Sequence, residues 1–195
     1  MAKKNQITLS DYLEYSEYER LLQKLREDKE YLWELFARLT FCTACRVSDV
    51  LNKKWEDILD KDQITVVEKK TGKPRIITFN SSVRKKLKEL YSLLGKPKPD
   101  SLIFCSSRSQ GAFTVQHVNR KWKYFRDRYR LGIKNFSTHT FRKTFGRYVY
   151  EINNRSAESL VLLNKILNHT SISVTKTYIG LVQDEINNVF NSIKF

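Results

Sequence analysis

Several residue types are scarce in this chain of 195 residues. It contains three cysteines, three prolines, six glycines, three histidines and one methionine. So few glycines and prolines, with 41% hydrophobic residues, exclude a collagen-like or low-complexity chain and favour a folded globular protein. No apolar run approaches the roughly 18–20 residues that a membrane-spanning helix requires. Because the N-terminus is not followed by the apolar stretch of a secretory signal, we expect a cytoplasmic protein.

The cysteines do not form a metal-binding pattern. Cys42 and Cys45 make a single C-x-x-C pair, and Cys105 lies far from both. A zinc site needs a second matched pair or two nearby histidines, and no cluster of carboxylates suggests a site for a divalent ion. We therefore expect small, buried thiols and neither a metal nor another cofactor.

Positive charge is concentrated in the middle of the chain. The net charge is +15 overall, but it is −2 over residues 1–60, +7 over 61–107, +10 over 108–147 and zero over 148–195. Residues 120–130 alternate cations with aromatic residues, which is also the pattern of a solvated helix with an apolar stripe. The clustering favours a polyanion partner, of which nucleic acid is the commonest. A membrane surface is the weaker alternative, because no terminal amphipathic helix carries a basic face.

The pattern of apolar residues predicts a mainly helical (α+β) fold. Turn residues between two β-rich segments predict a hairpin, and helical periodicity recurs on both sides of it. We find no internal repeat and no linker rich in glycine or proline. We therefore expect a short N-terminal tail over residues 1–12 and a single domain over 13–195. The predicted helices lie at 13–26, 30–42, 48–55, 82–94, 115–125, 139–149, 160–167 and 182–193, the strands at 64–68 and 75–79, and a short strand or buried turn at 102–105.

Candidate helix caps and core positions follow from the same pattern. Short polar residues precede three of the helices, and apolar residues repeat every three or four positions behind them. The expected caps are Ser81-Ser82, Thr114, and Ser137 or Thr138, and the expected core faces are Val115, Val118, Trp122 and Phe125 in one helix and Phe141, Phe145 and Val149 in the next.

The residues with chemical potential are few and scattered. His139 and Arg142 are three positions apart on a predicted helix and share a face, which lies off the apolar stripe. Each candidate has an ordinary structural explanation when it is taken alone: Arg46 can pair with Asp49, and Tyr178 is one of ten tyrosines. Only their order along the chain is specific.

In that order the motifs resemble the catalytic domain of the tyrosine recombinases, the phage integrase group, over about residues 13–190. This sequence has a counterpart for each family pattern: T-G-x-R-x-S-E-L, the hairpin lysine, H-x-L-R-H, L-G-H-x-S and T-x-x-Y. Three positions depart from them: Ala44 and Asn168 stand where glycine is usual, and Lys143 stands where histidine is usual. The matching segments are Thr43-Ala-Cys-Arg46-Val-Ser-Asp49 with Trp55-Glu-Asp-Ile58, Lys69-Lys-Thr-Gly-Lys73, His139-Thr-Phe-Arg142-Lys143, Leu167-Asn-His169-Thr-Ser171 and Thr175-Lys-Thr-Tyr178.

The resemblance implies an enzyme that breaks and rejoins DNA, a site-specific recombinase. Tyr178 would attack the scissile phosphate and give a 3′-phosphotyrosine link and a free 5′-hydroxyl, without ATP or metal. Arg46 and Arg142 would bind the nonbridging oxygens, since guanidinium groups suit phosphate. His139 and His169 would add donors there, and His139 has the alternative of helping to remove the tyrosine proton.

The resemblance also implies a general acid on the hairpin. Lys70 matches the family lysine and would protonate the 5′-oxygen leaving group. Its neighbours Lys69 and Lys73 remain alternatives.

Double-stranded DNA is the expected partner, with neither a membrane nor a small-molecule substrate. Larger family members carry an N-terminal core-binding domain, which we expect to be absent here. The chain would then be either a naturally short recombinase, like small bacterial DNA invertases, or a fragment of a longer integrase. The family acts as a tetramer on DNA, and the Val182–Ile193 helix would dock on a neighbour or pack on its own core.

Two other functions remain open from the sequence. One is a non-catalytic, basic DNA-binding regulator on the same scaffold, and the other is a strand relaxer like a type IB topoisomerase. The sequence does not distinguish integration, excision, inversion and dimer resolution, nor does it give the target site.

Overall fold

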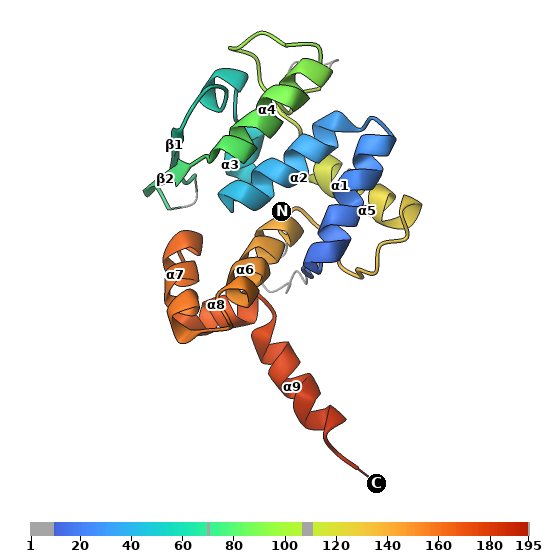
Figure 1. Ribbon diagram of the computed structural model, residues 1–195, viewed down its shortest axis with the longest axis vertical. Coiled ribbons are helices and arrows are strands. Elements are labelled where there is room, and N and C mark those ends of the chain that lie inside the picture. The colour runs from blue at the N-terminus through green and yellow to red at the C-terminus, as the bar shows by residue number, and fades with distance from the viewer. Residues whose placement is uncertain (1–9, 70, 107–110, 195) are drawn as a thin grey trace.

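The computed structural model describes residues 10–69, 71–106 and 111–194 of the chain (Figure 1). Helices dominate it, and two strands form one small antiparallel sheet, as the sequence predicts. Within these ranges no helix combines the length and apolar character needed to cross a bilayer. The elements in chain order are α1 (Tyr15–Glu27), α2 (Tyr31–Thr43), α3 (Val47–Leu51), the 3-10 helix η1 (Trp55–Asp57), β1 (Gln63–Val67), β2 (Pro74–Thr78), α4 (Ser81–Leu93), α5 (Val115–Arg128), α6 (Thr140–Ile152), α7 (Ala157–Leu167), α8 (Ile172–Tyr178) and α9 (Leu181–Asn191).

The hairpin forms where turn residues separate the two β-rich segments. β1 and β2 pair antiparallel, with Gln63 opposite Thr78 and Val67 opposite Pro74. Gly72 in the turn has a φ of +67°, a left-handed conformation that glycine adopts without strain. The segment 102–105 forms isolated bridges, Lys54 with Leu102 and Cys105 with Ala112, so it is closer to the buried turn than to a strand.

One of the three predicted helix caps is confirmed by the structure. The Thr114 side chain accepts a hydrogen bond from the His117 amide, as predicted for the start of α5. α4 is capped one residue earlier than predicted, by Asn80, and α6 begins after His139 rather than directly after Ser137 or Thr138. Asn80 is the stronger cap because its side-chain oxygen reaches the Val83 amide at 2.9 Å.

The main core is aromatic and joins α1, α2, α4, α5 and the first turn of α6. Trp33, Phe36, Trp122, Phe125 and Phe141 meet in this core, and Trp122 and Phe141 pack edge to face with ring centroids 4.7 Å apart. The predicted apolar stripe of α5 is buried except for its first member, since Val115 is 39% exposed. These contacts fix the position of Arg142, because Phe141 anchors the helix that carries it.

A second, smaller core lies below the first in Figure 1 and joins α6, α7 and α8. Leu160, Leu163 and Leu167 of α7 pack against Ile179, and Phe145 and Val149 of α6 cover them. α6 therefore belongs to both cores, and it carries its site residues at the boundary between them.

Two helical predictions need correction. The helix predicted over 48–55 ends at Leu51, and a 3-10 turn begins at Trp55, whose ring is buried. The segment Ile172–Tyr178 was not predicted to be helical but forms α8. Its sequence is short and polar, and packing of Thr175 and Ile179 against α7 stabilises it rather than an apolar periodicity of its own.

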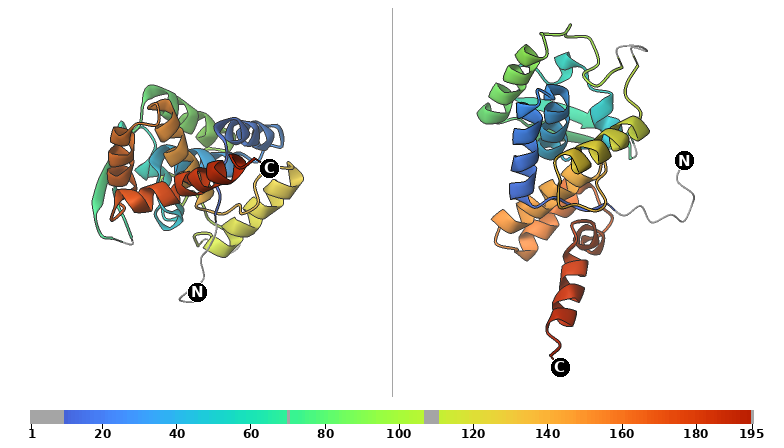
Figure 2. Two further views of the ribbon diagram at one scale, coloured as in Figure 1. Left: turned by 90° about the horizontal axis from the view of Figure 1, so that it is seen from below. Right: turned by 90° about the vertical axis from the view of Figure 1, so that its right-hand side faces the viewer.

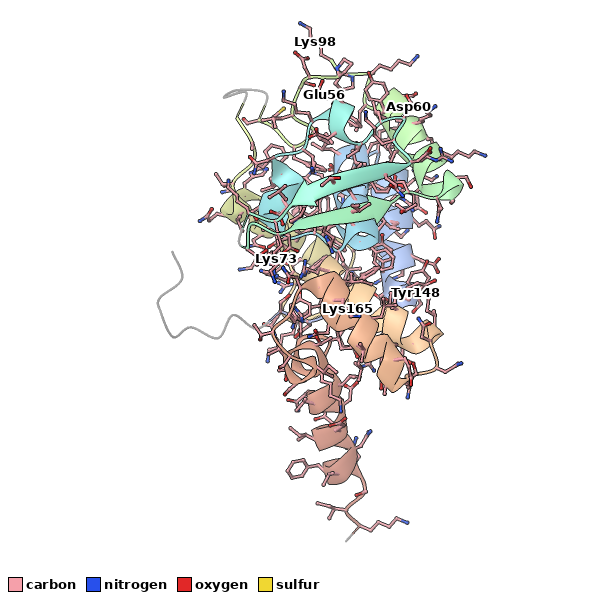
Figure 3. All side chains as sticks on the ribbon, turned by 90° about the vertical axis from the view of Figure 1, so that its left-hand side faces the viewer. Glu56, Asp60, Lys73, Lys98, Tyr148 and Lys165 are labelled. Carbon is pink, nitrogen blue, oxygen red and sulfur yellow. The ribbon has the colours of Figure 1, made fainter. Side chains whose placement is uncertain are left out.

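α9 projects away from the rest of the molecule in Figure 1, in the right-hand view of Figure 2 and in Figure 3. Leu181 is its buried residue, whereas Ile186, Val189, Phe190 and the following Ile193 are 44–69% exposed. The alternative that this helix packs on the core of its own chain is therefore wrong in this structure.

The close packing of Ile179, the C-cap of α8, against α6 leaves no room for a side chain at Gly146. A Cβ atom there would lie 2.7 Å from Cγ2 of Ile179. We expect Gly146→Ala to lower the free energy of unfolding by about 1–3 kcal/mol despite the better helix propensity of alanine, since overpacking forces a shift. Urea denaturation would measure this. Gly132→Ala, which adds a methyl group in open space, is the control; equal stability of the two variants would contradict the packing argument.

Candidate functional site

Arg142 occupies a buried position between the ends of two helices. Its side chain is 2% exposed, and it donates hydrogen bonds to the carbonyl oxygens of Ala44 and, at 2.6 Å, of Leu167. These carbonyls lie at the C-terminal ends of α2 and α7, where backbone oxygens lack helical partners and the helix dipole is negative. The two helix ends therefore hold the guanidinium group in place. Burial lowers the pKa of Arg142, and the nearby cations Arg46 and Arg75 lower it further.

The residues at these two helix ends explain two departures from the family pattern. Ala44, with φ +49°, and Asn168, with φ +51°, are the C-caps of α2 and α7 and are both left-handed. Glycine is preferred at such caps because it has no Cβ to clash. Alanine and asparagine retain the same backbone conformation here, so the caps keep the geometry that glycine would provide.

Arg46 follows the first of these caps and pairs with Glu68. Its Nη1 lies 2.5 Å from Oε2 of Glu68, at the end of β1. Arg46 does not pair with Asp49, the partner that an ordinary structural explanation suggested; Asp49 instead accepts a hydrogen bond from the Lys69 amide at 3.0 Å. Both carboxylates therefore connect the α3 region to the hairpin.

Glu68 is ionised although it is buried. Burial would raise the pKa of this carboxyl, but hydrogen bonds from Asn168, Arg46 and Thr71 lower the pKa to about 2. The result is one fixed negative charge beside a group of guanidinium cations.

Arg75 is a third guanidinium in this region, on β2. It donates to the carbonyl oxygens of Thr43 at 2.8 Å and Ile166 at 2.7 Å, and to Sγ of Cys45 at 3.1 Å. Arg75 thus binds the same two helix ends as Arg142, from the side of the hairpin. Figure 3 shows the hairpin, with Lys73 labelled near its turn, lying directly above α7, on which Lys165 is labelled.

His169 follows the second left-handed cap and is oriented by α8. Its Nδ1 lies 3.1 Å from Oγ1 of Thr175, which is fully buried and also receives a hydrogen bond from Asn164. Because Nδ1 contacts Thr175, the second ring nitrogen, Nε2, points away from Thr175. Thr175 is the first residue of the T-x-x-Y motif, so that motif holds His169 as well as carrying Tyr178.

Tyr178 directs its hydroxyl into the protein beside these cations. Its ring meets the His169 ring edge to face, with centroids 4.9 Å apart. The hydroxyl is buried and makes no hydrogen bond of normal geometry with the described residues, although Arg142 is close enough to affect it. Burial raises the pKa of the Tyr178 phenol, and the positive charges of Arg142 and, more weakly, Arg46 oppose that effect.

Lys143 lies over the ring of Tyr178. Its Nζ is 5.2 Å from the centroid of the Tyr178 ring and donates to the carbonyl oxygen of Ser10 at 2.5 Å. Burial lowers the pKa of Lys143. Residues 10–13 are fastened to the start of α6 by this bond and by a hydrogen bond from the Leu13 amide to Thr144.

The structure brings together four of the six predicted site residues: Arg46, Arg142, His169 and Tyr178. His139 is exposed at the start of α6, one helical turn from Arg142. Lys70 lies outside the described residues; its alternatives Lys69 and Lys73 are exposed on either side of the turn. The cysteines are free thiols, of which Cys45 is buried and Cys42 and Cys105 are half-buried.

Glu68 and Arg75 were missed by the sequence prediction, although a signal for both exists. β1 alternates exposed and buried residues, and Glu68 continues its inward-facing series after Ile64 and Val66. Arg75 likewise shares the inward face of β2 with Ile77. A charged residue at an inward-facing strand position needs a partner of opposite charge or a hydrogen-bonded site.

Other features lie outside this site. Among the described residues no group of three or more His, Cys, Asp and Glu side chains could hold a metal ion. A cavity of about 600 Å³ opens between α1, α2 and α4, and none of the predicted site residues lines it.

Comparison with known proteins gives a consistent result. Residues 11–184 match the model of the phage integrase family. The chain is 32% identical over 171 residues to the probable integrase/recombinase YoeC of Bacillus subtilis (strain 168), covering 85% of this chain and 90% of that protein.

Solved structures share the fold. The XerA recombinase superposes with a TM-score of 0.70 and 22% identity, over 96% of this chain and 67% of that one. A lambda integrase dimer bound to a COC′ core site superposes with a TM-score of 0.64 and 23% identity, over 92% of this chain and 62% of that one.

The ionised Glu68 makes stability depend on pH in the acid range. Its pKa of about 2 in the folded protein lies below the ordinary value of 4.5, so its contribution is complete above about pH 4.5 and is lost as the pH falls towards 2. We expect the difference in unfolding free energy between wild type and Glu68→Gln to shrink over this interval in urea titrations. Glu185→Gln removes a 65% exposed carboxylate 3.9 Å from Lys176 and is the control. A constant difference between pH 5 and 2 would contradict the ionised state.

Proposed function

The chain belongs to the phage integrase family, the tyrosine recombinases, and from this premise we propose that Tyr178 is the nucleophile of its DNA strand transfer. The observation that carries the proposal is the buried Tyr178 hydroxyl beside Arg142, with Arg46 and His169 around it. A tyrosine that serves only to pack in a core is not stabilised by placing its hydroxyl beside arginine and histidine side chains. A tyrosine that attacks an anionic phosphate needs such groups, because they offset the negative charge of the phosphate and of the phenolate.

The arginines suit the charge that develops in the transition state. Attack on a phosphodiester gives a five-coordinate phosphorus with additional charge on its nonbridging oxygens, and fixed donors stabilise it. Arg46 and Arg142 would supply guanidinium donors there. His169, held by Thr175, and His139 would add further donors.

The step balances without a cofactor or ATP. The Tyr178 oxygen gives its proton to a base, for which His139 is the candidate, and forms a bond to phosphorus, while the bond from phosphorus to the 5′-oxygen breaks. The 5′-oxygen takes a proton from a general acid, for which Lys70 is the candidate, with Lys69 and Lys73 as alternatives. The reverse step, with a 5′-hydroxyl of another strand, releases the tyrosine and joins the exchanged strand.

DNA has to displace the tyrosine locally. Arg142 is 2% exposed and the Tyr178 hydroxyl is its neighbour, so a phosphate can reach Arg142 only when Tyr178 shifts. Because burial raises the pKa of the phenol, the nucleophile is neutral in the DNA-free protein. The attacking phenolate would form only when DNA is bound and His139, the candidate base, takes up the phenol proton.

The basic surface of α5 suits the DNA backbone. Arg120 and Lys123 are exposed on it, and Lys121 lies 5.4 Å from the centroid of the Tyr124 ring. Such side chains would neutralise phosphates and add a strong salt dependence to binding. The DNA-bound lambda integrase offers a precedent within the fold. Residues 13–195 would act as one catalytic unit.

Tyr178→Phe tests the assignment of the nucleophile. We expect the covalent protein–DNA adduct to disappear while binding stays within about twofold, because only the attacking oxygen is removed. The substrates would be nicked duplexes tiled from the DNA on either side of the coding sequence, with adducts counted on denaturing gels. Tyr150→Phe, which removes a hydroxyl from the second core, is the control. An adduct formed by Tyr178→Phe would contradict the assignment, and binding without any wild-type adduct would favour the regulator.

Self-association on DNA would use α9. Ile186, Val189, Phe190 and Ile193 are exposed on this projecting helix, and such an apolar face suits a groove on a neighbouring copy in a tetramer.

Charges on the apolar face test this assembly. We expect Val189→Asp/Phe190→Asp to lower the mass of the DNA complex in light scattering, because two carboxylates would be buried at the interface. Asn188→Asp/Asn191→Asp adds the same charge to the opposite face of α9 and should leave the mass unchanged. Unchanged assembly in the first variant would count against docking through α9.

A further inference from the structure

The Glu68 carboxylate joins three segments that are far apart in the sequence. Its Oε2 receives hydrogen bonds from Nη1 of Arg46 at 2.5 Å, Oγ1 of Thr71 at 2.9 Å and Nδ2 of Asn168 at 2.9 Å. Glu68 itself is 1% exposed. One buried oxygen atom is therefore the meeting point of the start of α3, the hairpin turn and the end of α7.

Two of these segments carry site residues. Arg46 is directly involved, and Asn168 immediately precedes His169. Asn168 also donates to Oγ1 of Thr71 at 3.1 Å, so the helix end and the hairpin are held together by two bonds from one amide. The left-handed backbone of Asn168 directs its side chain to this position, where glycine would have none.

We propose that Glu68 and Asn168 form a positioning latch, which fixes the Arg46 guanidinium relative to the His169 loop so that both donors meet the same phosphate. This inference rests on the proposed function. Neither residue touches the reacting atoms, so both are positioning residues.

A carboxylate is suited to this task because the site is rich in cations. Arg46 and Arg75 lie close enough to lower the pKa of Arg142, which is the effect of repulsion between like charges. An ionised Glu68 offsets part of that repulsion and gives Arg46 one defined orientation. The second oxygen, Oε1, is buried without a hydrogen bond in the described structure. The hydrogen bonds to Oε2 alone therefore fix the orientation of the carboxylate.

The pairing suggests a swap experiment. Asn168→Gly removes the amide without strain at a left-handed position, and Asn168→Asp places a second carboxylate against Glu68. Glu68→Gln/Asn168→Asp restores an amide–carboxylate pair with the roles exchanged. Asn154→Asp is the matched control, since Asn154 is also left-handed, with φ +53°, and exposed.

The readout is the single-turnover rate of adduct formation on the nicked duplex at saturating DNA, with the affinity and the thermal midpoint measured alongside. We expect Asn168→Gly and Asn168→Asp to slow the rate about tenfold or more, with affinity within about threefold and folding intact at the assay temperature. Asn168→Asp should recover as the pH is lowered from 8 to 6, when one of the two adjacent carboxylates takes up a proton. The double variant should recover at least fivefold over Asn168→Asp.

Three results would overturn the latch: rates of both Asn168 variants within twofold of wild type, no recovery in the double variant, or losses that follow the unfolded fraction alone. Failure of the proposed function has a different signature, because the wild-type protein itself would then form no adduct at Tyr178.

Discussion

The site depends on one buried guanidinium group held between two helix ends. Arg142 binds the terminal carbonyl groups of α2 and α7, which have no helical partners of their own. Each helix ends at a left-handed residue, and a candidate site residue follows within two positions: Arg46 after Ala44, and His169 after Asn168. Arg142 therefore has a structural role besides the phosphate contact that we propose for it. It fixes the two loops from which the other donors extend.

Charge balance in this region is achieved with few carboxylates. Arg46, Arg75 and Arg142 converge, and Glu68 is the ionised acid placed among them, with Asp49 holding the adjoining Lys69 amide. A phosphodiester would complete the balance, as the proposed function requires. Arg142 and Arg46 oppose the effect of burial on the pKa of Tyr178, whose phenol they would stabilise as an anion.

The C-terminal region combines a fixed part with an exposed one. α7 and α8 are packed on α6 through the second core, and Thr175 joins His169 to the helix that carries Tyr178. Beyond Leu181 the apolar residues Ile186, Val189 and Phe190 of α9 are exposed to solvent. Tyr178, the proposed nucleophile, thus lies at the junction between a packed unit and an exposed helix, which would connect the proposed assembly on DNA with the position of the tyrosine.

The sequence by itself determined the helical class, the hairpin and the identity of the family, because apolar periodicity, turn residues and the order of short motifs are local properties. It also identified Arg46, His139, Arg142, His169 and Tyr178 as candidates, although their roles stay predictions. It did not give α8, whose helix depends on packing, or the pairing of Arg46 with Glu68 rather than Asp49. Glu68, Arg75 and Asn168 acquire their partners only when β1, β2 and the end of α7 come together, at sequence separations of 22 to 100 residues. Hydrogen bonds between such distant segments are decided by tertiary packing, since no local pattern specifies which buried donor will meet which acceptor.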